Sequence, residues 1–273
     1  MQSVERARSN EKCSWASSHE FFWIKRRKRR VAEINQIDWL SKLLNKSKKL
    51  LVLTGAGVST GSGIPDFRSA NGIYDRIKGV HYSGEEALSI DFLRREPELF
   101  YRNFIEHLYF PEAEPSFVHR FIARLESPDR QVTVLTQNID GLHQKAGSSR
   151  VVELHGSALR FRTRDGLKFD YSEVEVAQNA ICYKGEQLRP DIVLYGEALD
   201  TDAINSAICA LQEADTLLVL GTSLRVYPVA ALPQYFMGET KILVNKEATP
   251  LDGNFDLVIH ENIEAVLKKL GIS

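Results

Sequence analysis

Residues 50–68 read LLVLTGAGVSTGSGIPDFR, an apolar run followed at once by a glycine-rich segment. A short apolar run bounded by glycine is typical of a buried strand, so we expect a strand to end near Thr54. Glycines at such a strand end let the backbone approach a pyrophosphate, whose charge the backbone N–H groups offset. The stretch predicts a dinucleotide site at a strand end, and a tight structural turn is the alternative interpretation.

The same stretch argues against a hydride-transfer enzyme of the ordinary dinucleotide-binding type. Its glycines do not follow the Gly-x-Gly-x-x-Gly spacing. Pro65, followed by Asp66, Phe67 and Arg68, predicts a loop where a dehydrogenase would continue its helix.

Apolar runs and helical patterns alternate along the rest of the chain. Strand-like runs lie at residues 50–53, 132–135, 151–154, 192–195, 217–220, 242–244 and 257–259. Apolar residues at helical spacing lie at 37–44, 117–125, 204–211 and 263–270. This alternation predicts an α/β fold with a doubly wound parallel sheet. Residues 69–114 and 157–188 break the alternation and exceed an ordinary connection, so we expect two insertions that form a small second lobe.

The bulk composition limits the class of partner. The 273 residues are 43% hydrophobic, which fits one large domain, and the formal net charge of −1 gives no overall field that favours nucleic acid or a membrane. No stretch approaches the roughly 18 continuous apolar residues of a membrane helix. Cys13, Cys182 and Cys209 are too few and too scattered for a disulfide framework. We therefore predict a soluble, cytoplasmic protein.

Residues 1–30 are predicted to be an N-terminal extension. Residues 25–30 read KRRKRR, a run of cations that fits a solvated tail better than a targeting signal or a nucleic-acid arm. The extension is either disordered or absent from the natural product, which would then start at Val31 from a GTG codon. An intact-mass measurement on the native protein tests this hypothesis.

Two polar clusters follow strand-like runs, where open α/β sheets bind ligands. Residues 136–143 read TQNIDGLH, and their amide and carboxylate groups suit a carboxamide, ribose hydroxyls or a water. Residues 153–156 read ELHG, and His155 can take a proton near neutral pH. A lone histidine is more often a core or surface residue, so this assignment depends on the neighbouring motifs.

Together with three later motifs, these segments closely resemble the sirtuin, or Sir2-type, family. The later motifs read LRPDIVLYGE at 188–197, GTSLRVYP at 221–228 and VNKE at 244–247. The match spans about residues 36–270, and separated motifs in one order make coincidence negligible. The resemblance implies a Rossmann-like large lobe, a small lobe made of the two insertions and a substrate cleft between them, with residues 31–273 as the catalytic domain.

The resemblance also implies an NAD site, residue by residue. The phosphates would be held by Gly55, Ala56, Gly57 and Ser59. The loop that closes over the nicotinamide ribose would contain Asp66, Phe67 and Arg68. Ribose and nicotinamide would be oriented by Gln137, Asn138 and Asp140. The adenosine half would be held by Gly221, Thr222, Ser223, Asn245, Lys246, Glu247 and Phe255.

The activity that the resemblance implies is NAD-dependent removal of an acyl group from protein lysine. In the family's reaction the acyl oxygen attacks the nicotinamide ribose, nicotinamide leaves, and a histidine equivalent to His155 activates a ribose hydroxyl. Lysine and O-acyl-ADP-ribose are released. The catalytic residues would be His155, Asn138 and Asp140. The acyl-lysine peptide would add a strand beside Val193, Leu194, Tyr195, Gly196, Glu197, Leu224, Val226 and Tyr227.

Other functions stay open at this point. An ADP-ribosyltransferase or NAD hydrolase would send a different nucleophile, or water, to the same ribose carbon. A non-catalytic NAD or ADP-ribose sensor would regulate a partner, but it has no need of a base at His155. We expect an acyl-lysine protein as partner, without direct nucleic-acid or membrane binding, and the oligomeric state stays open.

The chain departs from the family between the ELHG motif at 153–156 and the LRPDIVLYGE motif at 188–197. Most sirtuins carry two Cys-x-x-Cys pairs there, whereas this chain has only Cys182, which cannot make a tetrahedral thiolate site. We therefore predict no zinc and a small lobe held by aromatic residues or mobile. Sirtuins that remove acidic acyl groups place an arginine three residues after a tyrosine, and here Tyr101 is followed by Phe104, which favours an apolar acyl group.

Overall fold

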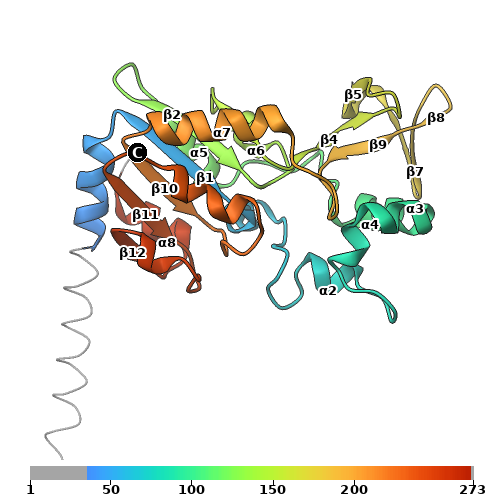
Figure 1. Ribbon diagram of the computed structural model, residues 1–273, viewed down its shortest axis with the longest axis horizontal. Coiled ribbons are helices and arrows are strands. Elements are labelled where there is room, and N and C mark those ends of the chain that lie inside the picture. Colours follow the sequence, from blue (N-terminus) through green and yellow to red (C-terminus); the bar gives the residue numbers. More distant parts are fainter. Residues whose placement is uncertain (1–35, 272–273) are drawn as a thin grey trace, which may run out of the picture.

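A six-stranded parallel sheet forms the large lobe of the computed structural model, which describes residues 36–271 (Figure 1). The predicted extension, with Cys13 and the cation run, lies outside the described residues. The strand order is β12-β11-β10-β1-β2-β3. The strands are β1 (Lys49–Thr54), β2 (Gln131–Thr136), β3 (Val151–Glu153), β10 (Thr216–Leu220), β11 (Thr240–Val244) and β12 (Leu257–Ile259). The predicted doubly wound α/β fold is confirmed.

Successive residues of β1 enter two hydrophobic cores on opposite faces of the sheet. Leu50 and Val52 pack in a core with the helix of residues 36–46, α5 (Phe117–Arg124) and α8 (Ile263–Lys269). Leu51 and Leu53 pack in a second core with α7 (Thr201–Glu213) and the 3-10 helix η5 (Val229–Tyr235). Because both faces are covered, most residues of the strands are apolar, which is why their runs were visible in the sequence.

The second lobe lies at the other end of the molecule (Figure 1). Its core joins residues from 73–108 with residues from 158–194, including the fully buried Phe100, Phe104 and Phe161. The first insertion supplies the helices α2 (Ile73–Ile77), α3 (Ile90–Arg95) and α4 (Pro97–His107). The second supplies β4 (Gly156–Arg162), β5 (Lys168–Asp170), β6 (Glu175–Ala177), β7 (Ala180–Tyr183) and β8 (Glu186–Gln187), and β4 also pairs with β9 (Arg189–Ile192).

The run at residues 192–195 was wrongly predicted to be a strand of the parallel sheet. β9 ends at Ile192, which pairs antiparallel with Gly156 of β4 in a separate three-stranded sheet. After β9, Tyr195 pairs with Ser89 in an isolated parallel β-bridge that is not part of a strand. The run is apolar because Ile192 and Leu194 belong to the core of the second lobe, and apolar composition does not reveal which strand is the partner. Within residues 36–271, no helix is long and apolar enough to cross a membrane.

Candidate active site

The glycine-rich loop after β1 packs directly on the loop after β10. A Cβ atom on Gly55 would lie 2.7 Å from the Cβ of Thr222, and a Cβ on Gly57 would lie 2.8 Å from the Cα of Gly221. The N–H of Gly57 donates to the carbonyl of Gly221 over 2.9 Å. These glycines therefore bring two strand ends together, because a side chain at either position would prevent this contact. The contact places the predicted phosphate-binding segment next to the segment predicted to hold the adenosine half.

A three-residue hydrogen-bond network joins this loop to the cluster after β2. The hydroxyl of Ser59 donates to Asp140 Oδ2 over 2.6 Å and accepts from Asn138 Nδ2 over 2.8 Å. Ser59 and Asn138 are buried. Burial raises the pKa of Asp140, while hydrogen bonds from Ser59 and the N–H of Leu142 offset part of that effect. The network fixes the predicted ribose-orienting side chains in one arrangement.

Gln137 connects His155 to the loop after β10. Its side-chain Nε2 donates to Thr222 Oγ1 over 2.9 Å, and its carbonyl oxygen lies 2.9 Å from His155 Nδ1. A carbonyl only accepts, so Nδ1 carries the proton and Nε2 keeps its lone pair. Burial lowers the pKa of His155, against a smaller opposite effect of this hydrogen bond, so the ring is neutral at pH 7. His155 is thus prepared to act as a base through Nε2.

The loop at 66–68 is held by its own aspartate. Asp66 Oδ1 accepts from the N–H groups of Arg68 and Ser69, over 3.0 and 2.7 Å, which makes the turn. Phe67 packs against the second-lobe core, with its ring centroid 5.4 Å from that of Tyr74. Arg68 pairs with Glu85 at 3.0 Å. The loop expected to close over the ribose is therefore attached to the second lobe.

Most backbone N–H groups of the predicted peptide segment at 193–197 already donate to acceptors within the protein. The N–H of Val193 donates to the carbonyl of His155, and the N–H of Tyr195 donates to that of Leu88, each over 3.0 Å. Among the described residues, Gly196, whose φ is 88°, is the member whose N–H has no partner. Leu194 is buried, so a peptide would meet its backbone and not its side chain.

Glu197 stabilises this same segment. Its carboxylate accepts from both terminal nitrogens of Arg189, over 2.7 and 2.9 Å, and from the N–H of Leu194 over 3.0 Å. On the facing segment, Leu224 is buried with a φ of 51°, a left-handed conformation that is unusual for leucine. Val226 is partly buried, and Tyr227 is 69% exposed, the side chain best placed to meet a peptide.

Three of the residues predicted to hold the adenosine half, Asn245, Lys246 and Glu247, lie at the carboxyl end of β11. Asn245 Nδ2 donates to the carbonyl of Glu247 over 2.7 Å, and Lys246 and Glu247 are exposed. The N–H of Gly221 donates to the carbonyl of Val244, which sets Asn245 beside Thr222 and Ser223. Phe255 is half-buried against the core that contains α7, so its ring is only partly free for a ligand.

Comparison with known proteins agrees with this geometry. The family model described as Sir2 family matches residues 55–228. An NAD-dependent protein deacetylase of Staphylococcus aureus is 42% identical over 239 residues, which are 86% of this chain and 98% of that protein. This chain belongs to the Sir2 family. A second NAD-dependent protein deacetylase, from Clostridium acetobutylicum, is 44% identical over the same shares of the two chains.

Solved Sir2 structures match over the same extent. One with a p53 peptide and NAD+ has a TM-score of 0.73 and 36% identity, over 86% of this chain and 98% of that one. A Sir2 structure bound to an acetylated peptide has a TM-score of 0.74 and 35% identity, over 87% and 99%. The Rossmann-like large lobe is therefore confirmed.

Three buried side chains beneath the Sir2 site had no role in the sequence analysis. Thr54 Oγ1 donates to Thr136 Oγ1 over 2.9 Å and lies 3.0 Å from His143 Nε2. Thr136 Oγ1 in turn accepts from the N–H of Asn138 over 3.0 Å. These contacts fix the position of the Asn138 backbone. Their one visible signal is that both threonines are the last residues of apolar strand runs.

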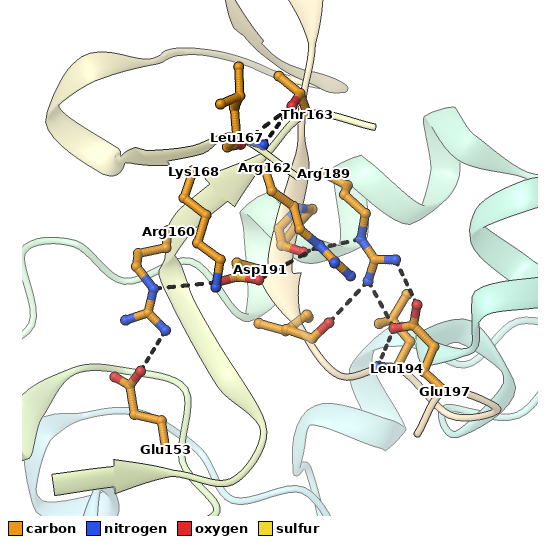
Figure 2. Close-up of polar contacts among 12 residues, drawn as sticks. Glu153, Arg160, Arg162, Thr163, Leu167, Lys168, Arg189, Asp191, Leu194 and Glu197 are labelled. Atoms are coloured by element: carbon orange, nitrogen blue, oxygen red, sulfur yellow. Dashed lines mark hydrogen bonds and ion pairs between the residues drawn. The ribbon is translucent and has the colours of Figure 1, made fainter. Parts of the chain in front are cut away.

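A charge cluster lies where this Sir2 chain passes from the large lobe into the second (Figure 2). Asp191, 13% exposed, faces Lys168 at 2.9 Å, Arg160 at 3.5 Å and Arg162 at 3.7 Å. Arg160 also reaches Glu153 of β3 over 2.6 Å. A cavity of about 640 Å³ borders the cluster and includes Leu154 and Gly156, the neighbours of His155. The cluster therefore ties β3, β4, β5 and β9 together close to the neighbours of His155.

Among residues 36–271, no group of three or more His, Cys, Asp or Glu side chains is arranged to hold a metal ion. Cys182 is partly buried in β7, and Cys209 is exposed on α7.

The turn after β4 is held by Thr163, whose Oγ1 bonds to the Asp165 carboxylate and accepts from the N–H of Leu167 over 3.0 Å.

Proposed function

We propose that this Sir2 chain is an NAD-dependent protein-lysine deacylase that releases nicotinamide and O-acyl-ADP-ribose. The observation that carries the proposal is the placement of the His155 imidazole, whose Nδ1 bonds to the Gln137 carbonyl and whose Nε2 has no hydrogen-bond partner among residues 36–271. A transfer that must deprotonate a ribose hydroxyl needs such a base with a pKa near or below neutrality. The curated relatives and the peptide-bound Sir2 structures support this activity.

The backbone donors at the two strand ends suit the phosphates of NAD. Among the described residues, the N–H groups of Ala56, Thr222 and Ser223 have no hydrogen-bond partner, so they can bind phosphate oxygens. NAD supplies the ribose carbon that accepts the acyl oxygen as nicotinamide departs. Asn138 and Asp140, held by Ser59, orient the ribose side. Phe67 shields the reacting carbon from water, and His155 Nε2 takes the hydroxyl proton.

The test is nicotinamide release from NAD with and without an acetyl-lysine peptide. A deacylase releases nicotinamide only when the peptide is present and yields one deacetylated peptide for each nicotinamide. An NAD hydrolase releases it without peptide, and an ADP-ribosyltransferase leaves ADP-ribose on the added protein; either result would replace the proposal. The variant His155→Ala should lose at least about 100-fold in turnover, while the exposed His81→Ala keeps it.

We also propose that the second lobe folds without zinc. The support is a set of contacts that can replace a metal as its cross-link: the Asp191 charge cluster and the aromatic pair Phe169–Tyr183, whose ring centroids lie 4.2 Å apart. Elemental analysis of the purified protein tests this proposal, and one zinc per chain would overturn it.

We propose that the preferred lysine substrate carries an apolar acyl group. The hydroxyl of Tyr101 donates to the carbonyl of Leu188 over 2.8 Å, and Phe104 is fully buried. Neither residue offers a cation to an acyl carboxylate, and Arg102 is exposed. Acetyl peptide should be turned over at least about tenfold faster than succinyl peptide, because an unpaired carboxylate would have to be desolvated. Faster succinyl turnover would contradict the proposal.

The remaining proposals concern location and partners. The scattered cysteines support a reducing, cytoplasmic compartment, and the near balance of charge supports protein substrates without direct nucleic-acid binding. Fractionation of the native host, with detection of the protein, tests the location.

A further inference from the structure

Tyr74 and Tyr195 meet through their hydroxyl groups, whose oxygens lie 2.6 Å apart. Tyr74 belongs to α2 of the first insertion, while Tyr195 is the central residue of the predicted peptide segment. The pair therefore joins two segments that are 121 positions apart in the chain. Against the opposite effect of burial, the Tyr195 hydroxyl also lies close enough to the Arg68 guanidinium to help raise the pKa of Arg68.

Tyr74 also contacts the loop expected to close over the NAD ribose. Its ring centroid is 5.4 Å from that of Phe67 and 5.2 Å from the guanidinium carbon of Arg68, within cation–π range. Its N–H donates to the carbonyl of Phe67 over 3.2 Å. One side chain thus touches both the NAD loop and the peptide segment.

The segment of residues 84–90 contacts Tyr74, Arg68 and Tyr195. A Cβ on Gly84 would lie 2.4 Å from the Cα of Tyr74, and Glu85 binds Arg68 at 3.0 Å. At its other end, the N–H of Ile90 donates to the carbonyl of Tyr195 over 3.0 Å. Displacement of Tyr195 therefore acts on Tyr74 both directly and through this segment.

We infer that Tyr74 is a positioning residue that couples peptide binding to closure of the NAD loop, through the hydroxyl of Tyr195. The inference rests on the proposed function. Tyr195 is 37% exposed, so water competes for its hydroxyl in the free protein. A peptide laid along residues 193–197 covers Tyr195 and excludes that water, which strengthens the hydroxyl pair. The stronger pair holds Tyr74 against Phe67 and Arg68, and NAD then binds to a loop that is already closed.

The test measures the dissociation constant of ADP-ribose by calorimetry, with and without saturating acetyl-lysine peptide. ADP-ribose cannot react, so the ratio of the two constants is an equilibrium coupling factor. We expect the native protein to bind ADP-ribose more tightly with peptide. Loss of one hydrogen bond should reduce that factor by about three- to tenfold in Tyr74→Phe and in Tyr195→Phe. The double variant should show no further loss, because both changes remove the same contact.

The matched control is Tyr235→Phe, which removes the hydroxyl of a half-exposed tyrosine on η5 and should keep the native factor. A merely structural role would lower the unfolding temperature without changing the coupling factor. The inference is overturned if the native factor is one, or if the single variants keep it. If the native protein binds ADP-ribose but no acetyl-lysine peptide, it is the proposed function that fails.

Discussion

His155 Nδ1 and the carbonyl oxygen of Gln137 lie 2.9 Å apart, and this contact decides which nitrogen of the imidazole faces the reaction. Because the carbonyl accepts, the proton is fixed on Nδ1 and Nε2 is the base. Burial lowers the pKa of this ring from its ordinary value of 6.5. The active form is the neutral one, so activity is lost as the pH falls through the lowered pKa.

We therefore expect the acidic limb of the kcat/KM profile for peptide to have an apparent pKa below 6.5. The measurement is initial rate against pH at low peptide concentration and saturating NAD. The same limb should be absent from the residual activity of His155→Ala. An acidic limb centred above pH 6.5 would contradict a buried, neutral base at this position.

Gly57 provides a test of the packing between the two strand-end loops. In Gly57→Ala the new Cβ would lie 2.8 Å from the Cα of Gly221, a backbone atom that cannot rotate away. We expect a loss of about 2 kcal/mol in the free energy of unfolding, and about tenfold weaker binding of ADP-ribose. The control Gly253→Ala meets nothing within 4 Å and should change both quantities little. Equal behaviour of the two variants would show that the loops tolerate separation.

Most of the central sheet could be predicted because its strands are buried on both faces. Leu50, Leu218 and Ile242 belong to unbroken apolar runs, and such runs can be recognised without knowing which strands lie beside them. Residues 192–195 have the same composition, yet they leave the sheet because Ile192 pairs with Gly156 of the second insertion. That partner is set by a long-range contact, which periodicity along one segment cannot contain.

The candidate site, like the sheet, was predictable from the sequence only in part. Ser59, Asn138 and Asp140 were predicted from motifs, and the structure brings them within hydrogen-bond distance. The sequence did not indicate that Gly57 packs on Gly221, or that Glu197 is held by Arg189. These relations depend on which loops meet in space. The assignments of Phe255 and of the peptide segments stay predictions until a complex is measured.

Because His119 and His143 are buried, we expect the free energy of unfolding to fall in acid. The two rings are buried with centroids 4.7 Å apart, and burial lowers their pKa values to about 4 and about 3. In the unfolded chain both take protons near pH 6.5, so below that pH the unfolded state binds more protons. The free energy of unfolding should fall by roughly 1–2 kcal/mol for each histidine between pH 7 and pH 5.

Urea unfolding at the two pH values measures this fall. In His119→Gln the fall should be smaller by roughly 1–2 kcal/mol, because one titrating group has been removed. The comparison uses the difference between pH values, so a uniformly less stable variant is still informative. An unchanged difference would mean that His119 is protonated in the folded protein, against its burial.

Asp191 is the anion on which the charge cluster between the lobes depends (Figure 2). Asp191→Asn would leave Arg160, Arg162 and Lys168 facing one another without it. Because these cations are 35–60% exposed, water screens part of the repulsion, and we expect a loss of only about 1–2 kcal/mol in the free energy of unfolding. In a protein of this size that is about a 4 °C lower melting temperature, and added salt should narrow the difference.

The control for this prediction is Asp91→Asn, which breaks an ion pair with Arg94 whose side chains are 82% and 71% exposed. Such a pair contributes little, so its melting temperature should stay within about 1–2 °C of the native protein. If Asp191→Asn melts no lower than Asp91→Asn, the cluster does not hold the second lobe. The lobe would then depend on its hydrophobic core, in which Phe104 of the first insertion packs against Phe161 of the second.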